Sequence, residues 1–236
     1  MNRLMGLMRS AMQKYNMIEQ GDRIAVGVSG GKDSVALLYA LAQMRKYYPQ
    51  KYELVAISLD PGFNGVPMDF GPIMGLCEKI DVPYTIKQTQ IAQIIFDYRK
   101  EPNPCSLCAR MRRGALHDLT KELGCNKIAL GHNLDDAVQT FYMNLLQGGS
   151  ISCFQPVTYL SRKDLTLIRP LIFAYEKDTK RAVKNAGLPV IKSPCPVDKK
   201  TERERVKQLL YTLEKDYDRL RIKTIGAMQR AHISGW

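Results

Sequence analysis

The sequence has no long apolar run and comparatively few acidic side chains. No stretch of its 236 residues approaches the roughly 18 consecutive apolar positions of a membrane-spanning helix, so we expect no membrane association. Aspartate and glutamate number 23 against 35 lysines and arginines, which gives a formal net charge of +12. This surplus favours a polyanionic partner, RNA or DNA, through phosphate neutralisation and counterion release. A solvated basic surface is the alternative interpretation.

The N-terminal segment 1–20 lacks the apolar centre and the small-residue cleavage site of a secretory signal. Its pattern predicts an amphipathic helix and a cytoplasmic protein. A transit peptide is the alternative, because the segment is basic and poor in acids. Residues 15–19 nevertheless run into the first expected strand without a processing signal.

Length and composition predict one α/β domain with appendages. A chain of this size, 45% hydrophobic, can bury roughly 70–75% of its unfolded surface. We find no internal repeat and no low-complexity linker. We therefore expect an N-terminal helix within 1–20 and a main domain over 21–192. A cysteine turn and a helical tail over 193–236 should pack on the same domain.

Six cysteines in a chain of cytosolic character argue against a disulfide framework. Only Cys105 and Cys108 have the spacing of metal ligands. Cys195 stands between two prolines, in a turn that is expected to be stiff and exposed. The others lie among apolar neighbours and are expected in the core: Cys77, Cys125 and Cys153.

Apolar runs alternate with amphipathic segments along the main domain. The expected strands cover 23–28, 53–60, 82–88, 126–131 and 165–171. The expected helices cover 33–45, 69–80, 109–124, 134–148 and 176–187. Nearly continuous apolar strands separated by helices predict an α/β fold with a doubly wound parallel sheet, covered on both faces and joined by right-handed crossovers. A charged helical tail follows.

The stretch "VSGGKDSVALLYAL", residues 28–41, passes from the first expected strand into a helix. Gly30 and Gly31 allow backbone angles that other residues avoid. Hydrogen-bond donors surround them: Ser29, Lys32 and Ser34. Because the first N–H groups of a helix lack internal partners, this turn predicts a phosphate site. It is not the common NTPase loop, since Asp33 follows the lysine where that motif has serine or threonine.

Polar residues also follow two other strands at the same expected edge of the sheet. Asp60 ends the second strand, and Gly131, His132, Asp135 and Asp136 follow the fourth. Ligands of open parallel sheets bind at this edge. Two carboxylates near a polyphosphate would be repelled unless Mg²⁺ lay between, so we expect a metal-bridged nucleotide. Taken alone, the two adjacent aspartates are typical of helix N-termini.

The motif "SGGKDS" resembles the pyrophosphatase loop (PP-loop) of the ATP-pyrophosphatases, which have an adenine nucleotide alpha-hydrolase-like fold. These enzymes cleave ATP to AMP and pyrophosphate while adenylating a substrate oxygen. Further motifs resemble the tRNA 2-thiocytidine synthetase group: "LDPGF", "CSLCARMRRG", "IALGHNLDD", "IRPL", "EKD", "PCP" and the tail "LEKDYDRLRIKTIGAMQ". The resemblance covers nearly the whole chain and implies that the turn holds pyrophosphate.

The resemblance also implies a [4Fe-4S] cluster held by Cys105, Cys108 and Cys195. Family members carry a second C-x-x-C late in the chain, whereas this sequence has Asp198 in place of its last cysteine. Asp198 is expected either to cap a helix or to be a weak, displaceable ligand of the fourth iron. A structural zinc site is the alternative, because thiolates suit both metals.

By the same resemblance, ATP activates the C2 oxygen of a cytosine, and sulfur then displaces AMP. Lys32 would stabilise the phosphates and Asp33 would anchor Mg²⁺, with Asp135 or Asp136 assisting or orienting the base. Arg112 would neutralise charge between cluster and ATP, contact an RNA phosphate, or face solvent. The expected ATP site comprises Ser29, Gly30, Gly31, Lys32, Asp33, Ser34, Asp60, Gly131 and His132.

The partners that follow are tRNA and a sulfur donor, either a cysteine desulfurase or sulfide; a homodimer is left open. Basic residues near the C-x-x-C motif are expected to bind tRNA: Arg99, Lys100, Arg110 and Arg113. Two other functions fit the same residues. One is a PP-loop enzyme acting on a tRNA uridine or a small metabolite, and the other is a zinc-stabilised, nucleotide-regulated RNA-binding module without catalysis.

Overall fold

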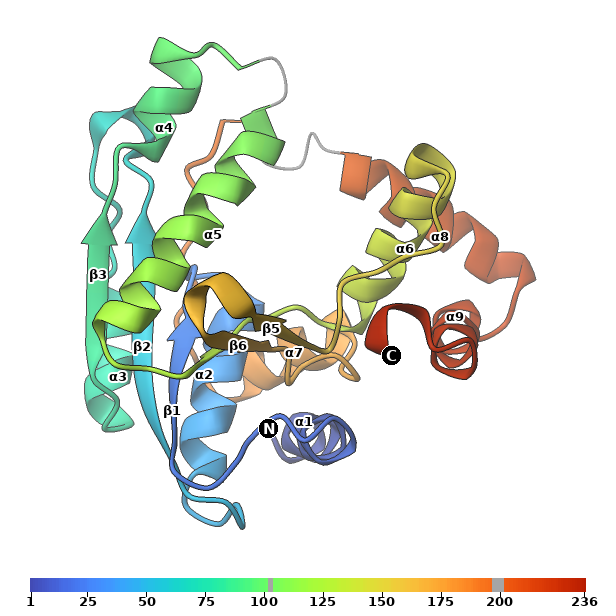
Figure 1. Ribbon diagram of the computed structural model, residues 1–236, viewed down its shortest axis with the longest axis horizontal. Coiled ribbons are helices and arrows are strands. Elements are labelled where there is room, and N and C mark those ends of the chain that lie inside the picture. The colour runs from blue at the N-terminus through green and yellow to red at the C-terminus, as the bar shows by residue number, and fades with distance from the viewer. Residues whose placement is uncertain (102–103, 197–201) are drawn as a thin grey trace.

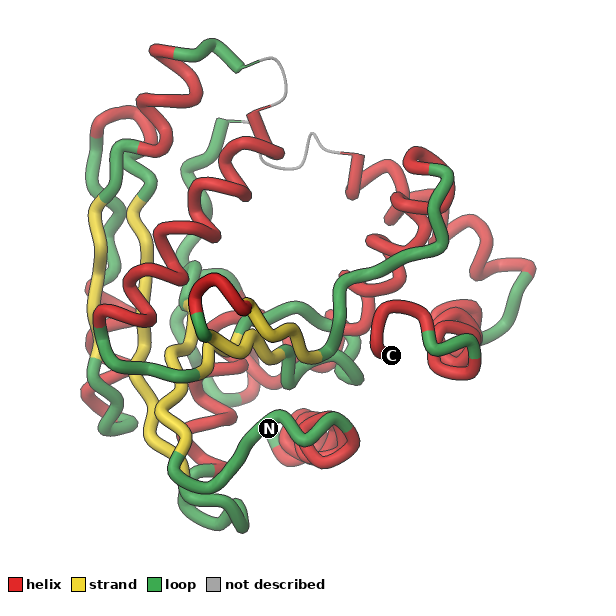
Figure 2. The backbone as a smooth tube through the Cα atoms, in the orientation of Figure 1, coloured by secondary structure: helices red, strands yellow, loops and turns green. Residues whose placement is uncertain are grey.

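The computed structural model describes residues 1–101, 104–196 and 202–236. In these ranges six strands form one sheet in the order β3-β2-β1-β4-β6-β5 (Figures 1 and 2). The strands are β1 (Asp22–Gly27), β2 (Tyr52–Asp60), β3 (Tyr84–Gln88), β4 (Lys127–Ala129), β5 (Val157–Leu160) and β6 (Leu165–Ile168). All neighbours pair in parallel except β5 and β6. The predicted doubly wound sheet is therefore confirmed, with one added edge strand.

The edge strand β5 was not expected from the sequence. It pairs antiparallel with β6 through the turn Ser161–Lys163, and none of its residues is fully buried. An edge strand with two half-exposed faces has neither the alternating nor the continuous apolar pattern that identifies strands. The strand expected over 165–171 ends at Ile168, because Pro170 has no N–H for the ladder.

The helices lie close to their expected positions. They are α1 (Asn2–Lys14), α2 (Lys32–Met44), α3 (Gly71–Lys79), α4 (Ile91–Gln93), α5 (Pro104–Glu122), α6 (Leu134–Gly148), α7 (Glu176–Asn185), α8 (Glu202–Asp216) and α9 (Leu220–Arg230). One expectation was wrong: α5 begins at Pro104 and not at residue 109. Proline suits the first turn of a helix, and this earlier start puts Cys105 and Cys108 on the helix.

Residues of the central strands alternate between two apolar cores. Ile24 and Val26 of β1 face the larger core, which α1, α2 and α3 cover. Ala25, between them, belongs to a second core with Leu119 of α5. This alternation follows from the two-residue period of a strand. Figure 1 shows α5 crossing one face of the sheet.

Both ends of the chain join the larger core. Met8 of α1 and two residues of the tail, Leu210 and Met228, are buried in it. Cys77, Cys125 and Cys153 are buried, as expected. Within the ranges given above, no helix is long and apolar enough to cross a bilayer.

The order of the strands reverses between β1 and β4. From β1 the chain proceeds through β2 to β3 on one side, and from β4 it continues to β6 and β5 on the other. Such a switch point opens a crevice at the carboxyl ends of its two strands. The turns after β1 and β4, which carry the predicted site residues, therefore lie next to each other.

Candidate active site

The turn after β1 needs glycine at one position. Gly30 has a φ of +83°, and a Cβ there would lie 2.9 Å from the Cβ of Ile191. The Ile191 N–H donates a hydrogen bond to the Gly30 carbonyl at 2.8 Å. Gly31 has an ordinary φ of −73°. The expectation that both glycines use special backbone angles is thus correct only for Gly30.

Two serine hydroxyls shape this turn. Ser34 Oγ donates to the Gly31 carbonyl at 2.9 Å and accepts from the Ser29 N–H at 3.2 Å. Ser29 Oγ accepts from the Gly31 N–H at 3.4 Å. The turn leads directly into α2, whose first N–H groups lack intrahelical partners and lie at the positive end of the helix dipole. This geometry suits a bound phosphate.

The turn after β4 contacts the first turn of α2. A Cβ on Gly131 would lie only 3.0 Å from the Ser34 nitrogen and 3.1 Å from the Asp33 carbonyl carbon. Asn133, the N-cap of α6, donates from Nδ2 to Asp33 Oδ1 at 3.3 Å. The two turns at the switch point therefore form one polar site, as the sequence predicts.

Lys32 and Asp33 form an ion pair at the centre of this site. Lys32 Nζ lies 2.9 Å from Asp33 Oδ2 and 2.9 Å from Glu176 Oε1. Thr179 donates its hydroxyl to Asp33 Oδ1. Burial lowers the pKa of Lys32, but the two carboxylates outweigh this effect and raise it. Lys32 is therefore charged, and an incoming phosphate would compete with these two carboxylates for it.

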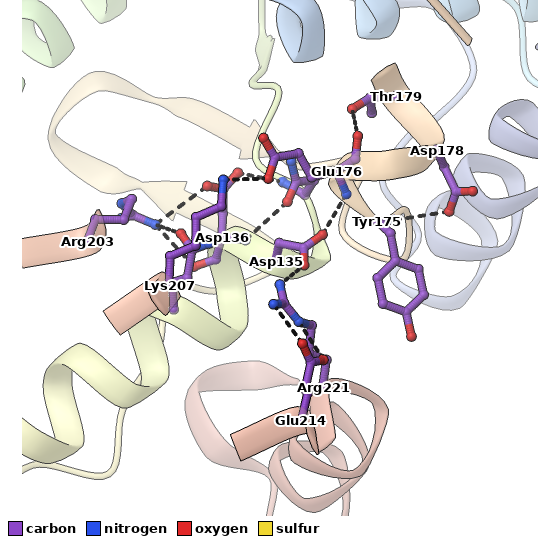
Figure 3. A network of polar contacts seen from close by, with 12 residues as sticks. Asp135, Asp136, Tyr175, Glu176, Asp178, Thr179, Arg203, Lys207, Glu214 and Arg221 are labelled. Atoms are coloured by element: carbon purple, nitrogen blue, oxygen red, sulfur yellow. Dashed lines mark hydrogen bonds and ion pairs between the residues drawn. The ribbon is translucent and has the colours of Figure 1, made fainter. Parts of the chain in front are cut away.

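Glu176, the first residue of α7, connects the turn to the C-terminal helices (Figure 3). Its second carboxylate oxygen lies 2.9 Å from Lys207 Nζ of α8. Burial raises the pKa of Glu176, but its bonds to Lys207 and Lys32 outweigh burial and hold the pKa at about 2. Glu176 is thus ionised and shared by two lysines.

Asp135 is buried and has partners for both oxygens. One oxygen accepts from the Glu176 N–H, and the other pairs with Arg221 of α9 (Figure 3). Arg221 also binds Glu214 through two hydrogen bonds of 2.8 and 3.0 Å. In this arrangement Asp135 ties α6 to α7 and α9, and a part in catalysis stays a prediction.

Asp136 closes a capping box at the start of α6. Its Oδ2 accepts from the Asn133 N–H at 3.0 Å, and Asn133 Oδ1 accepts from the Asp136 N–H at 3.1 Å. The interpretation of this aspartate as part of a helix N-terminus therefore fits the geometry. Asp136 Oδ1 lies 3.5 Å from Arg203 of α8. Burial raises the pKa of Asp136.

Asp60 lines a cavity of about 470 Å³ at the carboxyl ends of β2 and β3. Its oxygens accept from the Gly62 N–H at 3.0 Å and the Met68 N–H at 2.9 Å, so this side chain shapes the loop after β2. The volume lies in the range of small-molecule sites. Further lining residues are Val66, Thr89, Phe96 and Pro196.

The three predicted cluster ligands approach one another without forming a compact metal site. Cys105 is exposed, whereas Cys108 and Cys195 are partly buried. Burial raises the pKa of Cys108; Arg112 opposes this, and the thiols of Cys195 and Cys105 add to it. In the part of the chain that the structure describes, no three Cys, His, Asp or Glu side chains are gathered tightly enough for a metal ion. Asp198 lies outside the described residues.

A family model described as a PP-loop domain matches residues 6–213. The chain belongs to the PP-loop family. Two relatives named tRNA-cytidine(32) 2-sulfurtransferase are similar over most of their length. The one from Syntrophotalea carbinolica is 39% identical, over 92% of this chain and 85% of its own. The one from Pelobacter propionicus is 37% identical, over 98% and 86%. The resemblance to the tRNA 2-thiocytidine synthetase group is thereby confirmed.

A solved structure shares the PP-loop fold. It is the U34-tRNA thiolase NcsA from Methanococcus maripaludis with its [4Fe-4S] cluster. It superposes with a TM-score of 0.78 at 26% identity, covering 96% of this chain and 77% of that one. The predicted fold class is confirmed by this likeness together with the family match.

The remaining predicted residues differ in how deeply they are buried. Arg112 is partly buried on α5, within electrostatic reach of Cys108. The His132 ring packs against Phe154 at a tilt of 43°, with ring centroids 5.0 Å apart. The basic residues expected to bind tRNA are all exposed: Arg99, Lys100, Arg110 and Arg113.

Sequence reasoning missed the partners of Lys32 and Asp33. Glu176 and Thr179 come from the start of α7, which follows the last parallel strand of the PP-loop domain. The motif "EKD" points to this segment only through a resemblance. Its position after a carboxyl strand end is a usable signal. Lys207 and Arg221 give no such signal, because they lie on a helical tail with charges on every side.

Proposed function

We propose that the protein is an ATP-dependent tRNA sulfurtransferase that adenylates the C2 oxygen of a cytidine and replaces it with sulfur. Position 32, named for its relatives, is the expected target. One observation carries the proposal. The segment before Cys195 lies against the PP-loop through the Ile191–Gly30 hydrogen bond, and Pro196 lines the Asp60 cavity. These contacts hold the segment that carries Cys195 against the PP-loop turn, which supports a sulfur step close to the adenylation step.

The adenylation step uses the turn after β1. The cytidine C2 oxygen attacks the α-phosphorus of ATP, and the bond from that phosphorus to pyrophosphate breaks. The amides of the turn and Lys32 take up the negative charge of the leaving pyrophosphate. Asp33 would hold Mg²⁺ against the phosphates, because its carboxylate lies beside Lys32 at the start of α2.

The sulfur step uses the three cysteines that are not fully buried. Cys105, Cys108 and Cys195 would hold a [4Fe-4S] cluster, which supplies sulfur to the activated carbon when bound. The C2–O bond breaks as the new C–S bond forms, and AMP leaves. Each thiolate of such a cluster binds a different iron, so the thiols lie farther apart than the ligands of a single ion. A structural zinc site is the alternative, because thiolates suit both metals.

The implied partners are tRNA and a sulfur donor, either a cysteine desulfurase or sulfide, in the cytoplasm. Comparing thionucleosides in tRNA from cells with and without this protein tests the reaction. We expect loss of 2-thiocytidine. Loss of a thiouridine instead would support a uridine substrate. The likeness to a U34-tRNA thiolase is the observation behind this second candidate. Pyrophosphate release that does not depend on tRNA would point to a small metabolite, and no release at all would point to a binding module.

A further inference from the structure

Arg169, at the carboxyl end of β6, is a buried cation. It is 8% exposed, and among the described residues no carboxylate lies within ion-pair distance of it. One guanidinium nitrogen donates to the Gln155 carbonyl and to Thr158 Oγ1. The buried Nε has no hydrogen-bond partner in the described structure. Burying an unpaired charge is costly, so this guanidinium calls for a negatively charged ligand.

The guanidinium packs against an aromatic ring. Its central carbon lies 4.7 Å from the centroid of Phe154, and the imidazole of His132 lies 5.0 Å from the same centroid. His132 Nδ1 is buried and has no partner either, as far as the described ranges show. Because a bare lone pair is tolerated in the interior better than an unpaired N–H, we assign the imidazole proton to Nε2. His132 is then a neutral donor beside a fixed cation.

Arginines of two other helices, α5 and α8, add positive charge near His132 and Arg169. The pKa of His132 is lowered to about 3. Burial is the largest cause, and the positive charges of Arg169, Arg203 and Arg113 add to it. Arg113 projects from α5 and is exposed, while Arg203 of α8 lies 3.5 Å from the carboxylate of Asp136. Burial also lowers the pKa of Arg169, to about 10, so it stays charged at neutral pH.

The position favours a phosphate of RNA over the phosphates of ATP. The PP-loop follows β1, whereas Arg169 follows β6, two strands farther along the sheet. Two strand spacings are about 10 Å. The PP-loop has its own amides and Lys32 for pyrophosphate, and the Asp60 cavity lies on the other side of it, at β2 and β3. We propose that Arg169, supported by His132 and Phe154, binds a backbone phosphate of the RNA substrate. This inference rests on the proposed function.

Binding of an unmodified tRNA transcript at several salt concentrations tests the site. Arg169→Gln should weaken tRNA binding on the order of ten-fold, as expected when one charge-assisted hydrogen bond is removed, and lower the log–log salt slope by about one unit. Affinity for ATP should stay within about two-fold, because Arg169 follows β6, two strands from the PP-loop. Arg169→Lys keeps the charge and should retain the slope. Arg162→Gln is the matched control, since Arg162 is exposed at the opposite end of β6.

Two results would overturn the proposal. If Arg169→Gln binds tRNA with the affinity and slope of the parent, Arg169 only fixes the loop around Gln155. If affinity for ATP falls in parallel, the phosphate belongs to the nucleotide. A parent protein that binds no tRNA refutes the proposed function and this site together, whereas a parent that binds tRNA isolates the role of Arg169.

A measurement on the unaltered protein covers the case in which Arg169→Gln does not fold. With ¹⁵N-labelled arginine, the Nε–H resonance of Arg169 is assigned by its disappearance in Arg169→Lys. We expect this resonance to shift when the tRNA transcript is added and to stay in place with ATP alone. A shift with ATP alone, or no shift with tRNA, contradicts the proposal.

Discussion

Lys32 Nζ lies 2.9 Å from the Glu176 carboxylate, so the positive charge expected to receive phosphate already has an acidic partner. An incoming pyrophosphate must compete with this carboxylate. Glu176 keeps a second cation, Lys207, when it gives up the first. The exchange therefore leaves no isolated charge, and it links occupation of the PP-loop to the ion pair between α7 and α8.

We expect Glu176→Gln to raise affinity for pyrophosphate. Removing a partly exposed ion pair that competes for Lys32 should be worth about 1 kcal/mol, or roughly five-fold in the dissociation constant. Calorimetric titration with pyrophosphate in the absence of Mg²⁺ measures this change. Glu202→Gln removes the same charge from an exposed position of α8 and serves as the control. Weaker binding by Glu176→Gln would mean that Glu176 assists the anion.

Lys32→Ala and Asp33→Ala should each reduce pyrophosphate release by on the order of 10²–10³-fold, the usual effect of removing one strong electrostatic interaction from a transition state. Iron content should not change, because neither side chain contacts a thiol. Product formation and iron are measured on the same preparation, with Lys51→Ala, an exposed lysine, as the control. Near-normal turnover of Lys32→Ala would remove this lysine from the mechanism.

His132 predicts a dependence of stability on pH. Its pKa in the folded protein, about 3, lies below the ordinary value of 6.5, so the unfolded chain binds more protons between these values. The contribution of His132 to the free energy of unfolding should therefore fall as pH decreases from 6.5 toward 3. Urea unfolding of the parent and His132→Gln over this window isolates the effect, with exposed His232→Gln as the control. Parallel curves for parent and variant would contradict it.

Exposed basic residues on and before α5 predict the salt dependence of tRNA binding. Charge reversal at Arg113 or Arg110 should lower the log–log slope by about one unit for each phosphate that is no longer neutralised, and the same holds for Arg99 and Lys100. Arg23→Glu should leave the slope unchanged, because Arg23 lies at the amino end of β1, whereas the predicted site lies at the carboxyl ends of the strands. An affinity that does not vary with salt in the parent would favour a small-molecule substrate.

The elements that could be predicted are those with a local cause. The glycine turn before α2 follows from Gly30 and from a change of hydrophobic period, and the buried strands follow from continuous apolar runs. The predicted start of α5 is too late, because the expected helix begins only after the cysteine pair. Proline at the first helical position, here Pro104, is the signal for the earlier start.

The missed parts of the site depend on tertiary contacts. Glu176 meets Lys32 only because β6 returns to the sheet beside β4, and Lys207 meets Glu176 only because α8 packs on α6. The hydrophobic periodicity of α7 and α8 does not predict which charged residues of other elements they meet. The buried cation Arg169 was equally hidden, since arginine after a strand is usually exposed.

The last prediction concerns the cysteines. Replacing Cys105, Cys108 or Cys195 by serine should abolish iron binding after anaerobic reconstitution, because an open cluster site with three thiolates has none to spare. Iron content and visible absorption are measured for each variant. Cys77→Ala is the control: this thiol is buried in the core, and burial raises its pKa to about 11, so it is a poor thiolate ligand. Retention of the cluster without any one of the three would rule out this ligand set, and zinc in place of iron in the parent would favour a structural site.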